Sequence, residues 1–145
     1  MAEAAVHRSD GAERELLFAS AHPITVLLID DDPDLRSVLA GSLEALGYDV
    51  VQAADGSSGL DMLAERQPDV LVIDFAMPGM NGADVARVAR DRRPDMPIVL
   101  TSGYADSDAI DRAVGPNAKV LRKPFRIDEL LAAVNEALGT AERLT

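Results

Sequence analysis

The sequence contains no cysteine and no tryptophan, and its only two histidines are His7 and His22. A chain without cysteine has no disulfide, no thiolate metal site and no thiol nucleophile. Both histidines precede the first predicted strand. Zinc sites and serine–histidine catalysis therefore lose their usual ligands and bases.

Long apolar runs and basic clusters are also missing. The runs VLLI at 26–29 and VLVI at 70–73 are too short to cross a bilayer, and the N-terminal segment lacks a signal-peptide core. The formal charge is 14 − 25 = −11, the wrong sign for binding nucleic acid by counterion release. We therefore expect a soluble cytoplasmic protein with no direct membrane or nucleic-acid partner and with an attraction for divalent cations.

The chain has instead a regular alternation of strand and helix patterns. Strand patterns occupy 24–29, 49–53, 70–73, 97–101 and 118–122, and helical patterns occupy 34–46, 57–65, 82–91, 104–114 and 127–138. Short connections between such elements indicate parallel strands joined by right-handed crossovers. The sequence therefore predicts an α/β fold with a five-stranded, doubly wound parallel sheet and helices on both faces.

The domain organisation follows from length and composition. A chain of 145 residues that is 48% hydrophobic suits one domain, which we place at 23–139. Residues 1–22 carry four acidic residues against two arginines, which favours a mobile N-terminal extension, with a short docked helix at 12–19 as the alternative. Residues 140–145 form a tail too short for an effector module. Met1 and this tail favour a free-standing protein over a piece of a larger one.

Polar residues follow four of the five predicted strands. They are Asp30, Asp31 and Asp32 after the first strand, Asp74 after the third, Thr101 and Ser102 at the end of the fourth, and Lys123 after the fifth. The carboxyl ends of parallel strands face one crevice, so these side chains are expected to gather there. Clustered carboxylates repel one another unless a cation lies among them, and their oxygens suit Mg²⁺. A metal, a lysine, a hydroxyl and a carboxylate nucleophile together meet the needs of phosphoryl transfer.

Asp32 has a separate, structural interpretation. It precedes Pro33 and a predicted helix, where a carboxylate can accept hydrogen bonds from free backbone amides and complement the helix dipole. We therefore predict that Asp32 is a helix N-cap and that it lies outside the metal site.

Four segments in this order, LLIDDDP, VIDFAMPGMNG, PIVLTSG and VLRKPF, resemble the receiver (response-regulator) domain of two-component phosphorelays. The resemblance covers about residues 24 to 138 and is nearest to single-domain regulators and to the receivers of hybrid histidine kinases. It implies a flavodoxin-like strand order of 2-1-3-4-5 and no enzymatic activity beyond the domain's own phosphorylation and dephosphorylation. It implies a histidine kinase or a histidine phosphotransfer protein as phosphodonor and a downstream protein as target. It also allows a homodimer through the face formed by 104–114, 118–122 and 127–138.

The resemblance implies a role for each residue that matches the family pattern. Asp74 would accept phosphate from a phosphohistidine and form an acyl phosphate. Asp31 would bind Mg²⁺ directly, Asp30 would act partly through water, and the backbone carbonyl of Ala76 would supply another ligand. Lys123 would pair with a phosphoryl oxygen.

The resemblance also implies a switch hydroxyl at the end of the fourth strand. Counting from Asp74 and aligning at Pro97 assigns this role to Ser102 and not to Thr101. Bound phosphate would draw the Ser102 hydroxyl toward the site and move the segment that follows. Pro124 resembles the family's cis-proline.

Three departures from the family pattern concern this switch. The family often has Tyr or Phe where this chain has Val120, so Tyr104 becomes a candidate gate, with a packing role as the alternative. The stretch from Tyr104 to Ala118 is short and is interrupted by Gly115-Pro116, and a proline cannot continue a helix interior. Ala76 and Tyr104 occupy positions that influence acyl-phosphate lifetime in the family, and alanine cannot orient water by hydrogen bonding.

Two other functions compete with this interpretation. A receiver-like scaffold that is never phosphorylated is favoured by Val120 and by the interrupted helix. A phosphohydrolase of the haloacid dehalogenase type would use a D-x-D arrangement at Asp30-Asp31-Asp32, but Pro33, the short chain and the lack of room for a cap domain argue against it.

Overall fold

The computed structural model describes residues 23–103 and 118–144, with side chains described up to residue 139. The elements, in chain order, are β1 (Thr25–Ile29), α3 (Pro33–Ala45), β2 (Asp49–Ala53), α4 (Gly56–Arg66), β3 (Val70–Asp74), α5 (Gly82–Arg92), β4 (Ile98–Ser102), β5 (Ala118–Arg122) and α7 (Ile127–Leu144). All four strand pairings are parallel, and the strand order is β2-β1-β3-β4-β5. The predicted fold class and strand order are confirmed.

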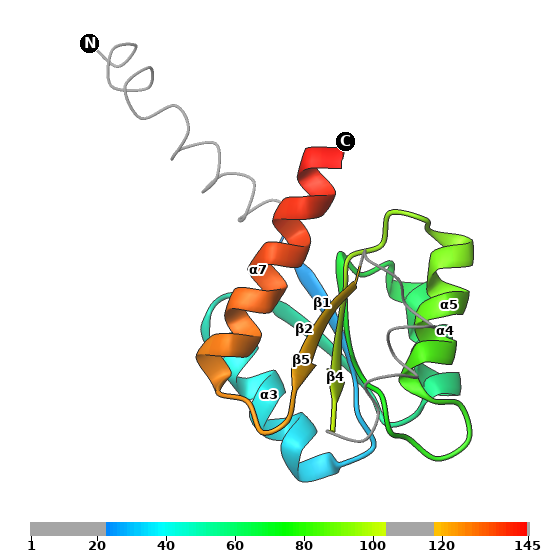
Figure 1. Cartoon of the computed structure of the whole chain (residues 1–145), viewed down its shortest axis with the longest axis horizontal. Helices are drawn as coiled ribbons and strands as arrows, with labels where there is room; N and C mark the ends of the chain where they lie inside the picture. Colours follow the sequence, from blue (N-terminus) through cyan, green and yellow to red (C-terminus); the bar gives the residue numbers. More distant parts are fainter. Residues whose placement is uncertain (1–22, 104–117, 145) are drawn as a thin grey trace.

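Helices cover both faces of the sheet, with α3 and α7 on one side and α4 and α5 on the other (Figure 1). Two separate apolar clusters fill the spaces between helices and sheet. In β1, Leu27 and Ile29 belong to the cluster under α4 and α5, while Val26 and Leu28 belong to the cluster under α3 and α7. Because β1 and β3 are buried on both faces, their sequences are continuously apolar and do not alternate with polar residues.

Three helices that begin beside the carboxyl end of the sheet are capped by side chains. Asp55 caps α4, where its carboxylate accepts from the backbone amide of Ser58. Asp32 precedes α3, and its carboxylate accepts hydrogen bonds from the backbone amides of Asp34 and Leu35, which confirms the predicted N-cap. Asn81 and Asp84 form a reciprocal capping box at the start of α5. Such caps satisfy amides that the helix itself leaves free, so each loop ends at a defined residue.

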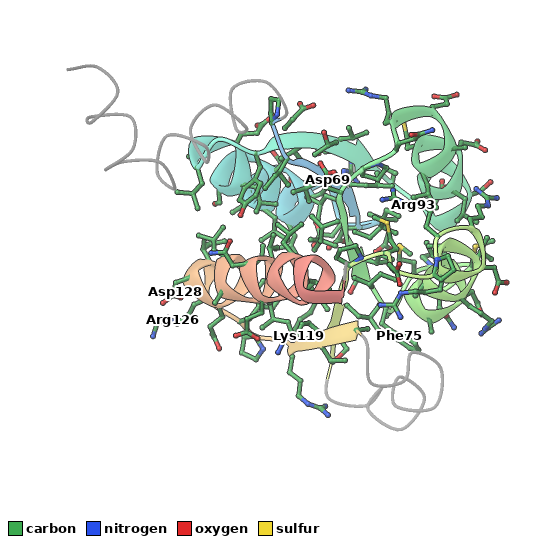
Figure 2. The ribbon with its side chains drawn as sticks, turned by 90° about the horizontal axis from the view of Figure 1, so that it is seen from above. Asp69, Phe75, Arg93, Lys119, Arg126 and Asp128 are labelled. Atoms are coloured by element: carbon green, nitrogen blue, oxygen red, sulfur yellow. The ribbon has the colours of Figure 1, made fainter. Side chains whose placement is uncertain are left out.

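The last strand and helix form the edge of the described structure. β5 is an edge strand paired only with β4, and Lys119 on β5 makes an ion pair with Glu136 on α7. Arg126 and Asp128 form an ion pair at the start of α7, away from the ion pair that Lys119 makes with this helix (Figure 2). α7 runs to Leu144, beyond the predicted end at Leu138. A glycine such as Gly139 costs a helix interior only about 1 kcal/mol, so helix formers on either side can carry the helix through it.

The helices predicted at 104–114 and, as an alternative, at 12–19 lie outside the described residues. Among the helices within the described ranges, none has both the length and the apolar character needed to cross a membrane.

A close backbone contact fixes the start of α5 against the end of β3. The amide of Gly82 donates to the carbonyl of Phe75 at 2.8 Å. A Cβ atom on Gly82 would lie 2.5 Å from the Asp74 carbonyl oxygen and 2.8 Å from the Phe75 Cα. These neighbours are backbone atoms, which cannot rotate away. Only glycine therefore fits at position 82 without moving the strand end.

We expect Gly82→Ala to lower the free energy of unfolding by about 2 kcal/mol, because the added methyl group overpacks a rigid backbone contact. Gly41 in α3 is the matched control, since its Cβ would meet no atom within 4 Å. Gly41→Ala should raise the free energy of unfolding by up to about 1 kcal/mol, because alanine is the better helix former. Urea denaturation followed by circular dichroism measures both changes, and equal effects from the two variants would contradict the contact described at Gly82.

Candidate functional site

Three carboxylates meet at the carboxyl end of the sheet. Asp30 directly follows β1 and Asp74 ends β3, and these strands are neighbours paired up to Ile29 and Ile73. One carboxylate oxygen from each of Asp30, Asp31 and Asp74 lies within 4.8 Å of the others. Asp30 and Asp74 are buried, with 2% and 4% of their surface exposed, whereas Asp31 is exposed. The predicted gathering of the acidic residues is thus present in the fold.

Lys123 supplies a positive charge to this acidic cluster. Its Nζ atom lies 2.9 Å from Oδ1 of Asp74, although the lysine follows β5 and the aspartate ends β3. The backbone amide of Lys123 donates to the carbonyl of Ser102, which ties the start of this loop to the end of β4. The peptide bond between Lys123 and Pro124 is cis, as the resemblance implied.

Hydrogen bonds and nearby charges determine the environment of Asp30. Its Oδ1 accepts a hydrogen bond from the amide of Asp32 at 2.9 Å, and its carbonyl oxygen accepts one from Nη1 of Arg36 at 2.6 Å. Burial raises the pKa of the Asp30 carboxyl above its usual value, and the nearby charges of Asp74 and Asp31 add to this effect. The amide of Asp32 and the charge of Lys123 act in the opposite direction. The carboxylate is therefore costly to keep charged in this position.

The two hydroxyls at the end of β4 have different surroundings. Thr101 pairs in register with Asp74, and its Oγ1 donates to Oδ1 of Asp74 at 3.3 Å. Ser102, predicted as the switch hydroxyl, is 1% exposed, and its Oγ has no hydrogen-bond partner among the described residues. The contact between Thr101 and Asp74 was not predicted from the sequence.

The remaining predicted residues lie around this centre or outside the described part. Ala76 is exposed in the loop between β3 and α5, two residues after Asp74. Val120 is 37% exposed on the edge strand β5. Tyr104 lies outside the described residues. Arg36, which sequence reasoning did not single out, links the end of β1 to β2, because its Nε also donates to the Gln52 side chain at 3.3 Å.

A family model for the response regulator receiver domain matches residues 26–135. The chain belongs to this family. Response regulator MprA from Mycobacterium sp. (strain KMS) is 37% identical over 119 residues, which is 80% of this chain and 51% of that protein. The probable transcriptional regulatory protein TcrX from Mycobacterium tuberculosis is 34% identical over 121 residues, with 83% and 52% covered. The receiver chain thus spans about half the length of the curated relatives it matches.

Solved receiver structures agree with this fold. A response regulator receiver protein from Sinorhizobium medicae WSM419 is 32% identical with a TM-score of 0.77, covering 83% of this chain and 98% of that one. A CheY-like receiver domain protein from Methanospirillum hungatei JF-1 is 26% identical with a TM-score of 0.77, covering 85% and 99%. The two-component family inferred from the four sequence segments is therefore shown, and the receiver fold accounts for the position of every residue of the acidic cluster.

We expect Asp30→Asn to stabilise the metal-free receiver domain at pH 7, because the amide removes a buried charge while its oxygen can still accept from the amide of Asp32. The folded chain holds the Asp30 proton more tightly than the unfolded chain. Stability should therefore fall as the pH rises from the usual carboxyl pKa of 3.8 through the raised value, and this part of the pH dependence should be absent from the variant.

Thermal unfolding in the presence of a chelator between pH 4 and pH 8 measures this difference. Asp32→Asn is the matched control, because asparagine caps a helix about as well as aspartate and should leave the profile unchanged. An Asp30→Asn variant that is less stable than the native chain at pH 7 would count against the described electrostatics.

Proposed function

We propose that this receiver domain is a phosphoacceptor that takes a phosphoryl group onto Asp74 from a histidine kinase or a histidine phosphotransfer protein, and that it signals through a downstream protein. The observation that carries the proposal is the ion pair of 2.9 Å between Lys123 and Asp74 beside two further carboxylates. A buried carboxylate oriented by a cation fits the needs of a nucleophile in phosphoryl transfer.

The residues present fit Mg²⁺. Carboxylate oxygens are the preferred ligands of this hard cation, and three of them converge within 4.8 Å. Asp30, Asp31 and Asp74 would hold the ion, together with the backbone carbonyl of Ala76. When bound, Mg²⁺ would neutralise charge on the transferring phosphoryl oxygens. Its charge would also counter the burial and the repulsion that together raise the pKa of Asp30.

The proposed step conserves atoms and charge. An oxygen of the Asp74 carboxylate attacks the phosphorus of a phosphohistidine, and a P–O bond forms. The P–N bond breaks, and its electron pair returns to the imidazole nitrogen of the donor. Lys123 pairs with a phosphoryl oxygen as a point charge, and the attacking group is the Asp74 carboxylate, so the step transfers no proton from the receiver.

Ser102 supports the switching part of the proposal. Its hydroxyl is buried and has no hydrogen-bond partner among the described residues, which leaves it able to donate to a phosphoryl oxygen. A phosphoryl group brings three strong acceptor oxygens and negative charge to the site. Phosphorylation would thus give the Ser102 hydroxyl an acceptor that no described residue supplies, and it would change the end of β4. Val120 and Tyr104 are the further switch positions implied by the family pattern.

The haloacid dehalogenase alternative is disfavoured by the position of Asp32. That reaction would need Asp32 to act beside Asp30, but the Asp32 carboxylate is engaged with the amides at the start of α3. The scaffold alternative would leave a destabilising acidic cluster with no function. The receiver domain is accordingly proposed to catalyse only its own phosphorylation and dephosphorylation.

We expect Asp74→Asn to abolish phosphorylation by acetyl phosphate, because the amide oxygen is too weak a nucleophile to form the acyl phosphate. Intact-mass spectrometry measures the fraction that carries one phosphate. Asp69→Asn is the matched control, since Asp69 lies immediately before β3, at the end of the strand opposite to Asp74. Equal phosphate uptake by Asp74→Asn and the native chain would overturn the assignment of the nucleophile.

A second comparison separates the metal site from the helix cap. Asp31→Asn should abolish the Mg²⁺ dependence of phosphorylation, whereas Asp32→Asn should keep both the rate and its Mg²⁺ dependence, because asparagine preserves the cap. Titration of Mg²⁺ by isothermal calorimetry and the phosphorylation rate at each concentration measure this. Loss of Mg²⁺ binding in both variants would mean that the three adjacent carboxylates act as one site.

A further inference from the structure

Thr101 is a buried hydroxyl in direct contact with the proposed nucleophile. It is 2% exposed, and β3 and β4 pair it directly with Asp74. Val99, two residues before Thr101 on β4, belongs to the apolar cluster under α3 and α7. Val72, two residues before Asp74 on β3, belongs to the same cluster. Since side chains alternate along a strand, Thr101 and Asp74 lie on the same face of the sheet. The hydrogen bond of 3.3 Å follows from this register.

Two donors converge on the same oxygen of Asp74. Lys123 contacts Oδ1 at 2.9 Å from the loop after β5, and Thr101 contacts it from β4. The second oxygen, Oδ2, receives no hydrogen bond from any residue in the described ranges. Two donors on one oxygen restrict rotation of the carboxylate about its last torsion, which is otherwise broad. The lone pairs of the other oxygen, Oδ2, stay available for a bond to phosphorus.

Ser102 does not share this contact. The side chains of Ile98 and Leu100 belong to the cluster under α4 and α5, and by alternation Ser102 lies with them on that face. Its Oγ has no partner among the described residues, whereas the Thr101 hydroxyl is engaged. The two adjacent hydroxyls therefore have separate surroundings, and Thr101 does not duplicate the switch position.

We propose that Thr101 is a positioning residue for phosphoryl transfer, whose hydroxyl fixes the plane of the Asp74 carboxylate before the phosphodonor arrives. This inference rests on the proposed function of Asp74. Thr101 forms and breaks no covalent bond in the step, and it acts only through the nucleophile. A correctly oriented nucleophile lowers the barrier because less orientational freedom is lost on reaching the transition state.

The test uses Thr101→Val, which replaces the hydroxyl by a methyl group of similar shape, and Thr101→Ser, which restores the hydroxyl. The rate constant for phosphorylation by acetyl phosphate at saturating Mg²⁺ is followed by phosphate-affinity gel electrophoresis, since the chain has no tryptophan to report on the site. We expect Thr101→Val to slow phosphorylation by about fivefold or more, and Thr101→Ser to recover at least about half of the native rate. The Mg²⁺ dissociation constant should change less than about twofold in both variants.

Thr25→Val is the matched control, because Thr25 begins β1 at the opposite end of the sheet. It should leave the phosphorylation rate unchanged. Thr101→Val with the native rate overturns the inference, and so does Thr101→Ser that is as slow as Thr101→Val, since the effect would then come from packing and not from the hydroxyl. If the native chain takes up no phosphate, the proposed function fails and this inference falls with it. If the native chain is phosphorylated and Thr101→Val is phosphorylated at the same rate, the proposed function stands and only the inference about Thr101 is overturned.

Discussion

The burial of two carboxylates side by side, Asp30 and Asp74, is the constraint on which the site depends. Each loses hydration, and each repels the other, so the pKa of Asp30 is raised. The charge of Lys123 offsets part of this cost, but its Nζ atom contacts a single carboxylate oxygen, Oδ1 of Asp74, at 2.9 Å. Charged groups this poorly compensated are uncommon in protein interiors unless they are retained for function. The remaining electrostatic deficit is what gives the site an affinity for a divalent cation, as we propose.

The fold produces this arrangement by simple geometric means. Parallel pairing of β1 with β3 brings Asp30 next to Asp74, although they are far apart in the sequence. β4 lies between β3 and β5, and the long side chain of Lys123 extends from the loop after β5 to Asp74 at the end of β3. The cap at Asp32 and the close approach at Gly82 fix the two loops that carry the acidic residues. The stable contacts of the surrounding fold therefore hold in place a cluster of carboxylates that is unfavourable by itself.

The sequence predicted the fold class, the acidic cluster and the separate role of Asp32, because these depend on strand-end positions and cap chemistry that a pattern retains. The strand order was predicted from the resemblance to receiver domains alone. The sequence did not predict the contacts of Thr101 and Arg36. Those contacts depend on register between strands and on the path of a long side chain, which a single sequence does not specify. The predicted end of α7 at Leu138 was wrong: the helix runs to Leu144, because a single glycine such as Gly139 costs a helix interior only about 1 kcal/mol and does not end it.

The two hydroxyls of β4 connect the site to both faces of the sheet. Thr101 lies on the face of α3 and α7 and donates to Asp74, whereas Ser102 lies on the face of α4 and α5, and no described residue is a hydrogen-bond partner of its hydroxyl. A buried hydroxyl without a partner costs about 1 to 3 kcal/mol. A phosphoryl group on Asp74, as proposed, would supply acceptors for Ser102 and a second partner for Lys123. The modification would then relieve the cost at Ser102 and change the contacts of Lys123, so its effects would appear at the ends of β4 and β5, where a downstream protein could respond to them.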